Sequence, residues 1–462
     1  MWWVYFQGFI LVAAAGRESY ERIAYFWHIT DIHFNPHHGD AKKGCGRSEY
    51  DSVSSTRNQR RSMGKYGDYT CDAPWELIES ASKTMMNRQN DNVDFVLWTG
   101  DALSHNNAKK LHENVKLQLL QNLTDLLMKT FSSQFVFPAL GHDDPMAKKE
   151  LGKMWSRWLP TDSMHTFAKG GYYMIDRKML RLQIIVLNTN LMRRGDNDEE
   201  ATEQWRWLHT VLEKFQLDRK TVYLVGHMPP GSHERQRGFP QAHAAHLVYT
   251  DYHNRKYLEL VRKFADIIVG QFFGHLHSDT FRVIYGERGR PVSWALLAPS
   301  ITPKRSSEGA NNPGLRIYKF DKDTGQVLDY TQYYLDLSQA NSKSKGEANW
   351  SIEYTFSSYY GISEITPNTL HQLADKLTAV NHNTFFDRYY TANSVKLYSN
   401  PHQSCDANCA HNHYCAITRV DYEEFAHCLK TAASALASSS FLVPVPNLSL
   451  IVLISILVII KV

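Results

Sequence analysis

Five short motifs rich in aspartate and histidine are spread over residues 31–277. They are Asp31-Ile32-His33, Gly100-Asp101, Gly141-His142-Asp143-Asp144, Gly226-His227 and Gly274-His275-Leu276-His277. Carboxylates and imidazoles together are typical ligands of Zn, Fe or Mn ions, and a shared carboxylate can bridge two ions about 3.5–4 Å apart. Such a pair of ions binds a phosphoryl group and generates a hydroxide nucleophile. The motifs therefore predict a two-metal hydrolytic site.

Each motif directly follows a segment that has the pattern of a β-strand. Strands are predicted at 25–30, 95–99, 134–140, 182–188, 221–225, 267–273, 293–298 and 315–320, and helices at 75–88, 108–129, 199–215 and 254–264. This alternation predicts an α/β domain. Because strand ends on one edge of a sheet converge, and a preceding glycine lets the backbone turn sharply, we expect the five motifs to form one site.

The composition limits the class of protein and its domain organisation. With 462 residues, 43% of them hydrophobic and 21% charged, the chain is neither disordered nor a many-pass membrane protein. A net charge of +4 without a basic cluster argues against a nucleic acid polymer as partner. A polar linker at 338–349 is expected to separate a catalytic domain at 17–337 from a small helical subdomain at 350–430.

The two ends of the chain predict export and membrane attachment. Residues 2–12 are apolar and are followed by small residues, which indicates a signal peptide over 1–16. Residues 431–462 contain small residues, a spacer and an apolar tail at 448–460, which is typical of a glycosylphosphatidylinositol (GPI) anchor signal. A retained membrane-spanning helix is the alternative, but 13 residues at about 1.5 Å each do not cross about 30 Å of hydrocarbon. The expected location is the outer face of the plasma membrane.

Six cysteines and two sequons agree with the secretory pathway. The simplest pairing joins Cys45 to Cys71 and forms two disulfides among the cluster Cys405, Cys409, Cys415 and Cys428. A zinc site in that cluster is disfavoured, because no two cysteines have the C-x2-C spacing. Asn122 and Asn349 begin sequons and are predicted glycosylation sites.

The ordered motifs resemble those of the calcineurin-like metallophosphoesterases, which run D-x-H, G-D, G-N-H-D/E, G-H and G-H-x-H. The phrases around them, Trp98-Thr99-Gly100-Asp101, Val136-Phe137-Pro138-Ala139-Leu140-Gly141, Gly226-His227-Met228-Pro229-Pro230-Gly231 and Gln271-Phe272-Phe273-Gly274-His275-Leu276-His277-Ser278-Asp279, look like the acid sphingomyelinase branch. The C-terminal cysteine cluster resembles that branch too. Asp31 follows the predicted signal too closely for a saposin domain, which favours the acid sphingomyelinase-like phosphodiesterases, and the lipid-anchor signal favours their membrane-anchored type.

The resemblance implies a β-sandwich flanked by helices and a site with two Zn²⁺ ions. By motif, Asp31, His33 and His277 would bind the first zinc, and Asp101 would bridge. His227 and His275 would bind the second zinc. His105 matches a family histidine that contacts the substrate phosphate or protonates the leaving oxygen. A hydroxide between the metals would attack phosphorus.

One motif departs from the family pattern. Where the family has Gly-Asn-His-Asp, this chain has Gly141-His142-Asp143-Asp144. Either His142 replaces the asparagine and ligates the second metal, with Asp143 replacing the acid-base histidine, or an asparagine was deleted and His142 kept the acid-base role. The sequence predicts an extracellular zinc phosphodiesterase acting on a choline-phosphate lipid such as sphingomyelin, or on nucleotides and related phosphoanhydrides. The alternative is a catalytically impaired surface protein that binds lipid or modulates a receptor.

Overall fold

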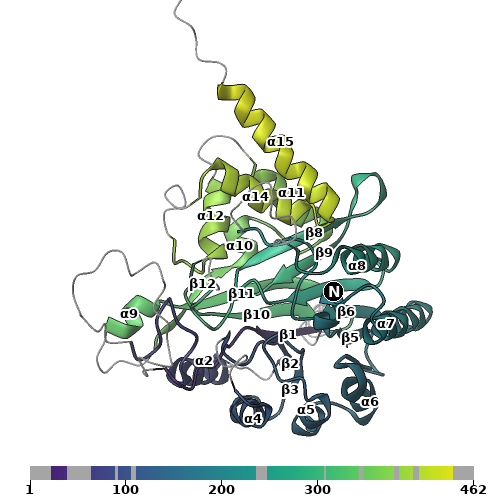
Figure 1. The fold of residues 1–462 in the computed structure, drawn as a ribbon, viewed down its shortest axis with the longest axis vertical. Helices are drawn as coiled ribbons and strands as arrows, with labels where there is room; N and C mark the ends of the chain where they lie inside the picture. The colour runs from purple at the N-terminus through teal and green to yellow at the C-terminus, as the bar shows by residue number, and fades with distance from the viewer. Residues whose placement is uncertain are drawn as a thin grey trace, which may run out of the picture.

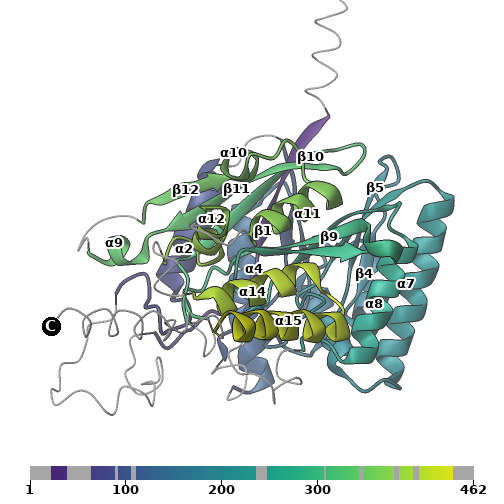
Figure 2. The same ribbon diagram turned by 90° about the horizontal axis from the view of Figure 1, so that it is seen from above.

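A computed structural model describes residues 22–38, 64–88, 92–105, 111–235, 247–305, 309–342, 348–378, 384–398 and 405–440, with side chains as far as residue 431. Within these ranges, two six-stranded mixed sheets pack against each other and are flanked by helices (Figure 1, Figure 2). The α/β sandwich expected for the chain is thereby confirmed.

Each sheet contains a run of neighbouring parallel strands. The first sheet has the order β12 (Trp350–Thr355), β11 (Val327–Leu335), β10 (Gly314–Asp321), β1 (Ile23–Ile29), β2 (Val93–Trp98) and β3 (Phe135–Pro138). The second sheet has the order β4 (Tyr173–Ile175), β5 (Leu182–Val186), β6 (Thr221–Val225), β7 (Ile268–Phe273), β9 (Pro291–Leu297) and β8 (Thr280–Tyr285). Strands β1, β2 and β3 are parallel, and so are β5, β6 and β7. Their carboxyl ends therefore lie together at one edge of each sheet.

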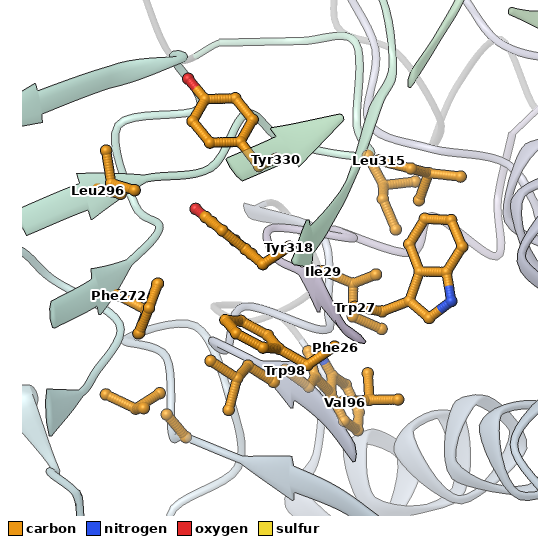
Figure 3. Close-up of a cluster of buried hydrophobic side chains, with 14 of the residues drawn as sticks. Phe26, Trp27, Ile29, Val96, Trp98, Phe272, Leu296, Leu315, Tyr318 and Tyr330 are labelled. Atoms are coloured by element: carbon orange, nitrogen blue, oxygen red, sulfur yellow. The ribbon is translucent and has the colours of Figure 1, made fainter. Parts of the chain in front are cut away.

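Aromatic side chains hold the two sheets together (Figure 3). Phe26 of β1 stacks on Tyr318 and Phe95 within its own sheet, with ring centroids 4.7 and 4.8 Å apart. It also meets Phe272 of β7 edge to face across the sandwich, at 5.3 Å. Large buried rings supply much of the apolar area of a core. This packing fixes how far apart the strand ends of the two sheets lie.

Amphipathic helices cover the sheets. The helical elements are α2 (Trp75–Arg88), α4 (Glu113–Thr130), α5 (Lys148–Met154), α6 (Thr161–Gly170), η2 (Thr189–Arg193), α7 (Glu199–Leu217), α8 (Asp251–Lys263), η4 (Glu287–Gly289), α9 (Leu337–Ser342), α10 (Phe356–Tyr360), α11 (Pro367–Lys376), α12 (Thr384–Asn393), α14 (Ala407–Thr418) and α15 (Tyr422–Ser440). Apolar residues of α7 and α8, such as Leu208 and Tyr257, share a buried cluster with Leu224 of β6. Helices α2 and α4 contribute to the other main cluster, with β1 and β2.

Several element boundaries differ from the sequence prediction for identifiable reasons. The helix expected to begin at residue 254 begins at Asp251, because the Thr250 side chain accepts a hydrogen bond from a backbone N–H of its first turn. The helix expected from residue 108 begins at Glu113, because the preceding His112 has extended backbone. Strand β12, just beyond the expected linker, pairs with β11 and completes the first sheet. Residues 350–355 thus belong to the sheet, while the domain boundary itself stays a prediction.

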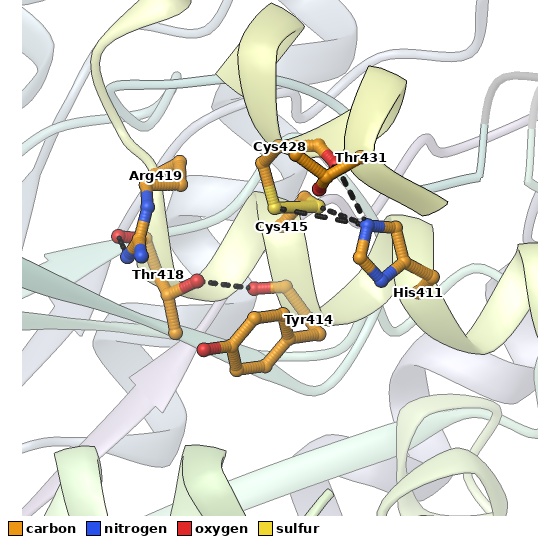
Figure 4. The surroundings of a disulfide bond; sticks show 7 residues. All are labelled: His411, Tyr414, Cys415, Thr418, Arg419, Cys428 and Thr431. Atoms are coloured by element: carbon orange, nitrogen blue, oxygen red, sulfur yellow. Dashed lines mark hydrogen bonds between the residues drawn. A yellow bond between two sulfur atoms is a disulfide. The ribbon is translucent and has the colours of Figure 1, made fainter. Parts of the chain in front are cut away.

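The C-terminal helices gather beside β8 and β9 (Figure 1). Two disulfides form among the last four cysteines, as expected, and they are Cys405–Cys409 and Cys415–Cys428. The second joins α14 to α15, next to the imidazole of His411 (Figure 4).

Several predictions fall on residues that the structure does not describe. The signal peptide at 1–16 and the tail at 441–462 lie outside the described ranges. So does Cys45, which is the expected partner of Cys71. Backbone of the expected anchor signal is described through Ser440, where it continues α15. Within the described ranges, no helix is both long and apolar enough to cross a membrane.

A buried ion pair ties the C-terminal helices to the sandwich. Arg282 of β8 donates to Glu234 at 3.0 Å, with both side chains fully buried, and Asn393 of α12 donates to the other carboxylate oxygen at 3.5 Å. Burial opposes ionisation of Glu234, but Arg282 holds its pKa well below the usual range.

Replacing Glu234 with alanine is expected to lower the free energy of unfolding by about 3–5 kcal/mol, because Arg282 is left buried and unpaired. Urea denaturation measures the loss. The matched control is Arg255→Ala, which breaks an exposed ion pair with Asp251 on α8 and is expected to cost less than about 1 kcal/mol. Equal losses in the two variants would contradict the prediction.

Candidate metal centre

The five motifs meet at the carboxyl ends of parallel strands. They follow β1, β2 and β3 of the first sheet and β6 and β7 of the second. The loops contact one another directly, since the Asp31 N–H donates to the Gly100 carbonyl at 3.0 Å and the Gly274 N–H donates to the His227 carbonyl at 2.9 Å. The convergence expected from the sequence is therefore present.

The candidate metal ligands themselves occupy the sharp turns of the backbone at the site. Five residues have left-handed backbone, with φ between 47° and 69°: Asp31, His33, Asp101, His275 and His277. Non-glycine residues in this region cost of order 1–3 kcal/mol each and cluster at functional sites. Of the preceding glycines, Gly100 has positive φ, at 93°. Gly141 serves another purpose, because a Cβ there would lie 2.1 Å from an Asp101 carboxylate oxygen.

A first group of donor atoms is formed by Asp31, His33 and His277. The Nδ1 atoms of His33 and His277 lie 3.1 and 2.8 Å from the carbonyls of Leu103 and Lys304, and carbonyls only accept. Each Nδ1 therefore carries a proton, which leaves the Nε2 lone pairs for a metal. The two Nε2 atoms face each other at 3.1 Å, and that of His277 lies 3.3 Å from Asp31 Oδ1.

A second group is formed by Asp101, His142, His227 and His275, whose ligand atoms all lie within 4.8 Å of one another. The Nδ1 of His227 donates to the Thr99 carbonyl at 2.8 Å, so its Nε2 is the atom that faces Asp101 Oδ2, at 3.0 Å. His142 Nδ1 lies 2.8 Å from the same oxygen. His33 Nε2 of the first group lies 3.7 Å from it. Asp101 is thus shared between the two groups.

Unpartnered polar atoms show that the arrangement fits metal ions. Asp31 Oδ1, Asp101 Oδ2 and His275 Nδ1 are buried and accept or donate no hydrogen bond within the described part of the chain. Buried polar atoms without partners are costly, and the cost falls when a cation binds them. Carboxylate and imidazole donors in two adjoining groups suit two ions of the zinc, iron or manganese type.

Comparisons with known proteins agree with the geometry. Residues 24–279 match the profile of the calcineurin-like phosphoesterases, and residues 290–435 match the acid sphingomyelin phosphodiesterase C-terminal region. Human acid sphingomyelinase-like phosphodiesterase 3b is 32% identical over 93% of this chain and 93% of its own. The chain belongs to the acid sphingomyelinase-like phosphodiesterase family.

Other members of the family are similarly close. Human cyclic GMP-AMP phosphodiesterase SMPDL3A is 31% identical over 92% of this chain and 94% of its own. Sphingomyelinase phosphodiesterase C of Dictyostelium discoideum is 29% identical over 87% of this chain and 92% of its own. The chain is therefore a metallophosphoesterase, and its similarity to the phosphodiesterases of this family extends over nearly its whole length.

In this phosphodiesterase, the carboxylates of the site favour the protonated form of two neighbouring imidazoles when no metal is bound. Burial opposes a charge on His33, but the Asp31, Asp101 and Asp72 carboxylates raise its pKa to about 10. Burial likewise opposes a charge on His227, and Asp101 raises its pKa to about 9. Burial opposes ionisation of Asp101, yet His227 and His142 hold its pKa well below the usual range. Protons and metal ions therefore compete for the same lone pairs.

This competition predicts that a bound divalent metal ion, with zinc as the probe, stabilises the protein more as pH rises. Protonation of His33 and His227 stabilises the metal-free fold fully below the unfolded pKa of 6.5, and this is lost as pH rises through about 9 and 10. Zinc instead needs neutral imidazoles and gains affinity over the same interval. The difference in Tm between zinc-loaded and chelated protein is expected to widen from pH 6.5 to 9.5, as measured by calorimetry. A constant difference would contradict the prediction.

His105 lies beside the first group and has a partner that sequence analysis missed. Its ring stacks on that of His33, with centroids 4.0 Å apart and planes 5° from parallel. Its Nδ1 lies 3.1 and 3.3 Å from the two Asp72 carboxylate oxygens, and its backbone N–H donates to Asp72 as well. Burial opposes ionisation of Asp72, but His105, His33 and Lys304 lower its pKa to about 2. Asp72 thus holds the ring of His105 in place. No spacing rule pointed to it, because the two residues are 33 positions apart.

The altered motif places His142 among the donors of the second group. Its Nδ1 lies 3.2 Å from His227 Nε2, in addition to its contact with Asp101. This position favours the interpretation in which His142 replaces the family's asparagine, over the one in which an asparagine was deleted. Asp144 has a structural part, since its carboxylate accepts from the backbone N–H groups of Gly141, Asp101 and Ala102 at 2.7–3.0 Å. Burial and the nearby Asp101 raise the pKa of Asp144 to about 6.

Proposed function

We propose that this protein is a zinc-dependent phosphodiesterase with two Zn²⁺ ions per chain. The observation that carries the proposal is the position of Asp101 Oδ2, which lies 2.8–3.7 Å from imidazole nitrogens of both donor groups. Asp31, His33 and His277 would hold one ion. His142, His227 and His275 would hold the other, and Asp101 would bridge them.

The residues of the chain divide the work of phosphodiester cleavage. Bound zinc ions supply Lewis acidity toward phosphoryl oxygens and a nucleophile at neutral pH. Backbone carbonyls of Leu103, Lys304 and Thr99 fix the tautomers of three ligand imidazoles. Asp72 accepts a hydrogen bond from Nδ1 of His105 and orients the ring, so that the protonated ring would give its Nε2 proton to the departing oxygen and become neutral.

The substrate we propose is a phosphodiester or phosphoanhydride of a nucleotide or of a choline-phosphate lipid. The activities named for the relatives support both classes, since one is a cyclic GMP-AMP phosphodiesterase and others are sphingomyelinase-like enzymes. Metal donors recognise the phosphoryl group that these compounds share, whereas the pocket walls must distinguish them.

The test is hydrolysis by the full-length protein purified from a secretory host. Bis(p-nitrophenyl) phosphate should be cleaved, turnover should stop with a chelator and return with zinc, and metal analysis should give two zinc ions per chain. Cyclic GMP-AMP, ATP, CDP-choline and sphingomyelin then decide the substrate. A folded, zinc-supplied protein that cleaves none of them from acid to neutral pH would instead support a surface lipid-binding or modulator protein.

For location, we infer export and attachment to the outer leaflet through a GPI anchor. The sequence patterns at both ends support this inference, and two disulfides agree with an oxidising compartment. Phosphatidylinositol-specific phospholipase C should release the protein from intact cells. Protein that stays with the membrane after this treatment would favour the retained helix. Asn122 and Asn349 are both exposed and are the proposed glycosylation sites.

A further inference from the structure

The two altered residues of the Gly141-His142-Asp143-Asp144 motif are neighbours in space as well as in sequence. The Asp143 backbone N–H donates to Asp101 Oδ1 at 2.9 Å, which fixes the loop beside the shared carboxylate. His142 turns its Nδ1 toward Asp101 Oδ2, at 2.8 Å. The other ring nitrogen, Nε2, lies 3.9 Å from Asp143 Oδ2.

Asp143 is a buried carboxylate with an oxygen in need of a donor. Its side chain is 8% exposed, and Oδ2 has no hydrogen-bond partner within the described part of the chain. Two imidazole nitrogens lie near it, His33 Nδ1 at 4.0 Å and His142 Nε2 at 3.9 Å. His33 Nδ1 already donates to the Leu103 carbonyl. Of these two nitrogens, His142 Nε2 is the one left to donate to Asp143, and at 3.9 Å it must move closer to the carboxylate to form a hydrogen bond.

We propose that Asp143 is a positioning residue for His142. When Nδ1 of His142 binds the second metal, its proton must sit on Nε2, and Asp143 accepts it. Metal-binding histidines commonly donate their other N–H to a carboxylate, which orients the ring and raises its basicity. The proposal rests on the proposed function, because it assumes metal at the second group.

The proposal explains why two adjacent positions differ together from the Gly-Asn-His-Asp pattern. An asparagine that binds a metal through its amide oxygen has no ring N–H that needs a carboxylate acceptor. A histidine that binds through Nδ1 has such an N–H on Nε2, and a neighbouring carboxylate can accept it. The exchange gives the second group three imidazoles, from His142, His227 and His275, in place of two imidazoles and an amide. It also removes the imidazole that follows in the family pattern, which leaves proton donation to His105.

A double-mutant cycle on zinc affinity tests the proposal. Asp143→Asn is expected to weaken binding of one of the two zinc ions by about 10–100-fold, measured by competition with a chromogenic chelator and by metal analysis. Affinity for the other ion should stay unchanged. In a His142→Asn background, Asp143→Asn should cause no further loss, because the ring that Asp143 orients is gone. Asp162→Asn, at an exposed position of α6, is the matched control.

Circular dichroism and the Tm of each variant establish that it folds, and Asp143→Ala repeats the test with a variant that cannot donate a hydrogen bond. Unchanged zinc affinity in both Asp143 variants would overturn the positioning role while leaving a two-zinc enzyme intact. Equal losses with and without His142 would also overturn it. Wild-type protein that binds fewer than two zinc ions would overturn the proposal and the proposed function together.

Discussion

Replacing Asp101 with asparagine is expected to lower kcat/KM for a phosphodiester by about 10³-fold. A metal ion contributes several kcal/mol of charge stabilisation in the transition state, and about 4 kcal/mol corresponds to that factor. Asp101 Oδ2 is buried, accepts no hydrogen bond within the described part of the chain and lies close to imidazoles of both groups, so the charge lost would serve both proposed ions. An amide of the same shape supplies no charge in its place.

Steady-state kinetics and metal analysis on the same preparation check this result. Zinc content should fall below two per chain, and added zinc should restore little activity. Asp125→Asn, an exposed position on α4, is the matched control and should match wild type. An Asp101→Asn protein that keeps two zinc ions and nearly full activity would show that the carboxylate is not shared between metals.

Replacing His105 with glutamine is expected to lower kcat by about 10²–10⁴-fold for substrates with an alkoxide leaving group. The loss should be small for p-nitrophenyl esters, because p-nitrophenolate leaves without a proton. His105 lies close enough to His33 and His277 to share a metal with them, but its Nδ1 is held by Asp72 and it is not among the ligands we propose, so zinc content should stay at two. Comparing kcat for the two ester types, with zinc analysis, measures the effect.

The Asp72→Asn variant separates orientation of His105 from proton donation by it. It removes the charged acceptor 3.1 Å from His105 Nδ1 and keeps the shape. We expect the same dependence on leaving group with a smaller loss, about 10–100-fold, by analogy with carboxylates that orient metal-bound histidines. Equal losses on both ester types in the His105 variant would indicate a part in binding or folding instead of proton transfer.

Much of the site was predictable from local sequence. Asp31, Asp101 and His227 each follow a buried, β-branched or aromatic strand segment, and parallel strands have their carboxyl ends on one edge. Residue type then limits the chemistry, since carboxylates and imidazoles bind few classes of ligand. Strand order and pairing between the sheets were not predictable in this way, because they depend on contacts such as Phe26 with Phe272.

The structural features that the sequence did not predict also depend on contacts between distant parts of the chain. Strand β12 follows a polar segment and gains its structure by pairing with β11, which lies in another part of the sequence. The left-handed backbone of His33 and His277 is likewise held by the loops packed around it. Propensity alone disfavours that backbone for both residues.

The sequence by itself determined the donor types, their order along the chain and their place after strands, because these are local properties. Only the tertiary structure decided which donors lie together, that His142 lies with Asp101, His227 and His275, and that Asp72 and Asp143 lie beside His105 and His142. The contacts of His142 with Asp101, at 2.8 Å, and of His105 with Asp72, at 3.1 Å, join segments far apart in sequence. The approach of His142 Nε2 to the adjacent Asp143, at 3.9 Å, depends on which way the His142 ring points. Such distances are set only when the two sheets pack together.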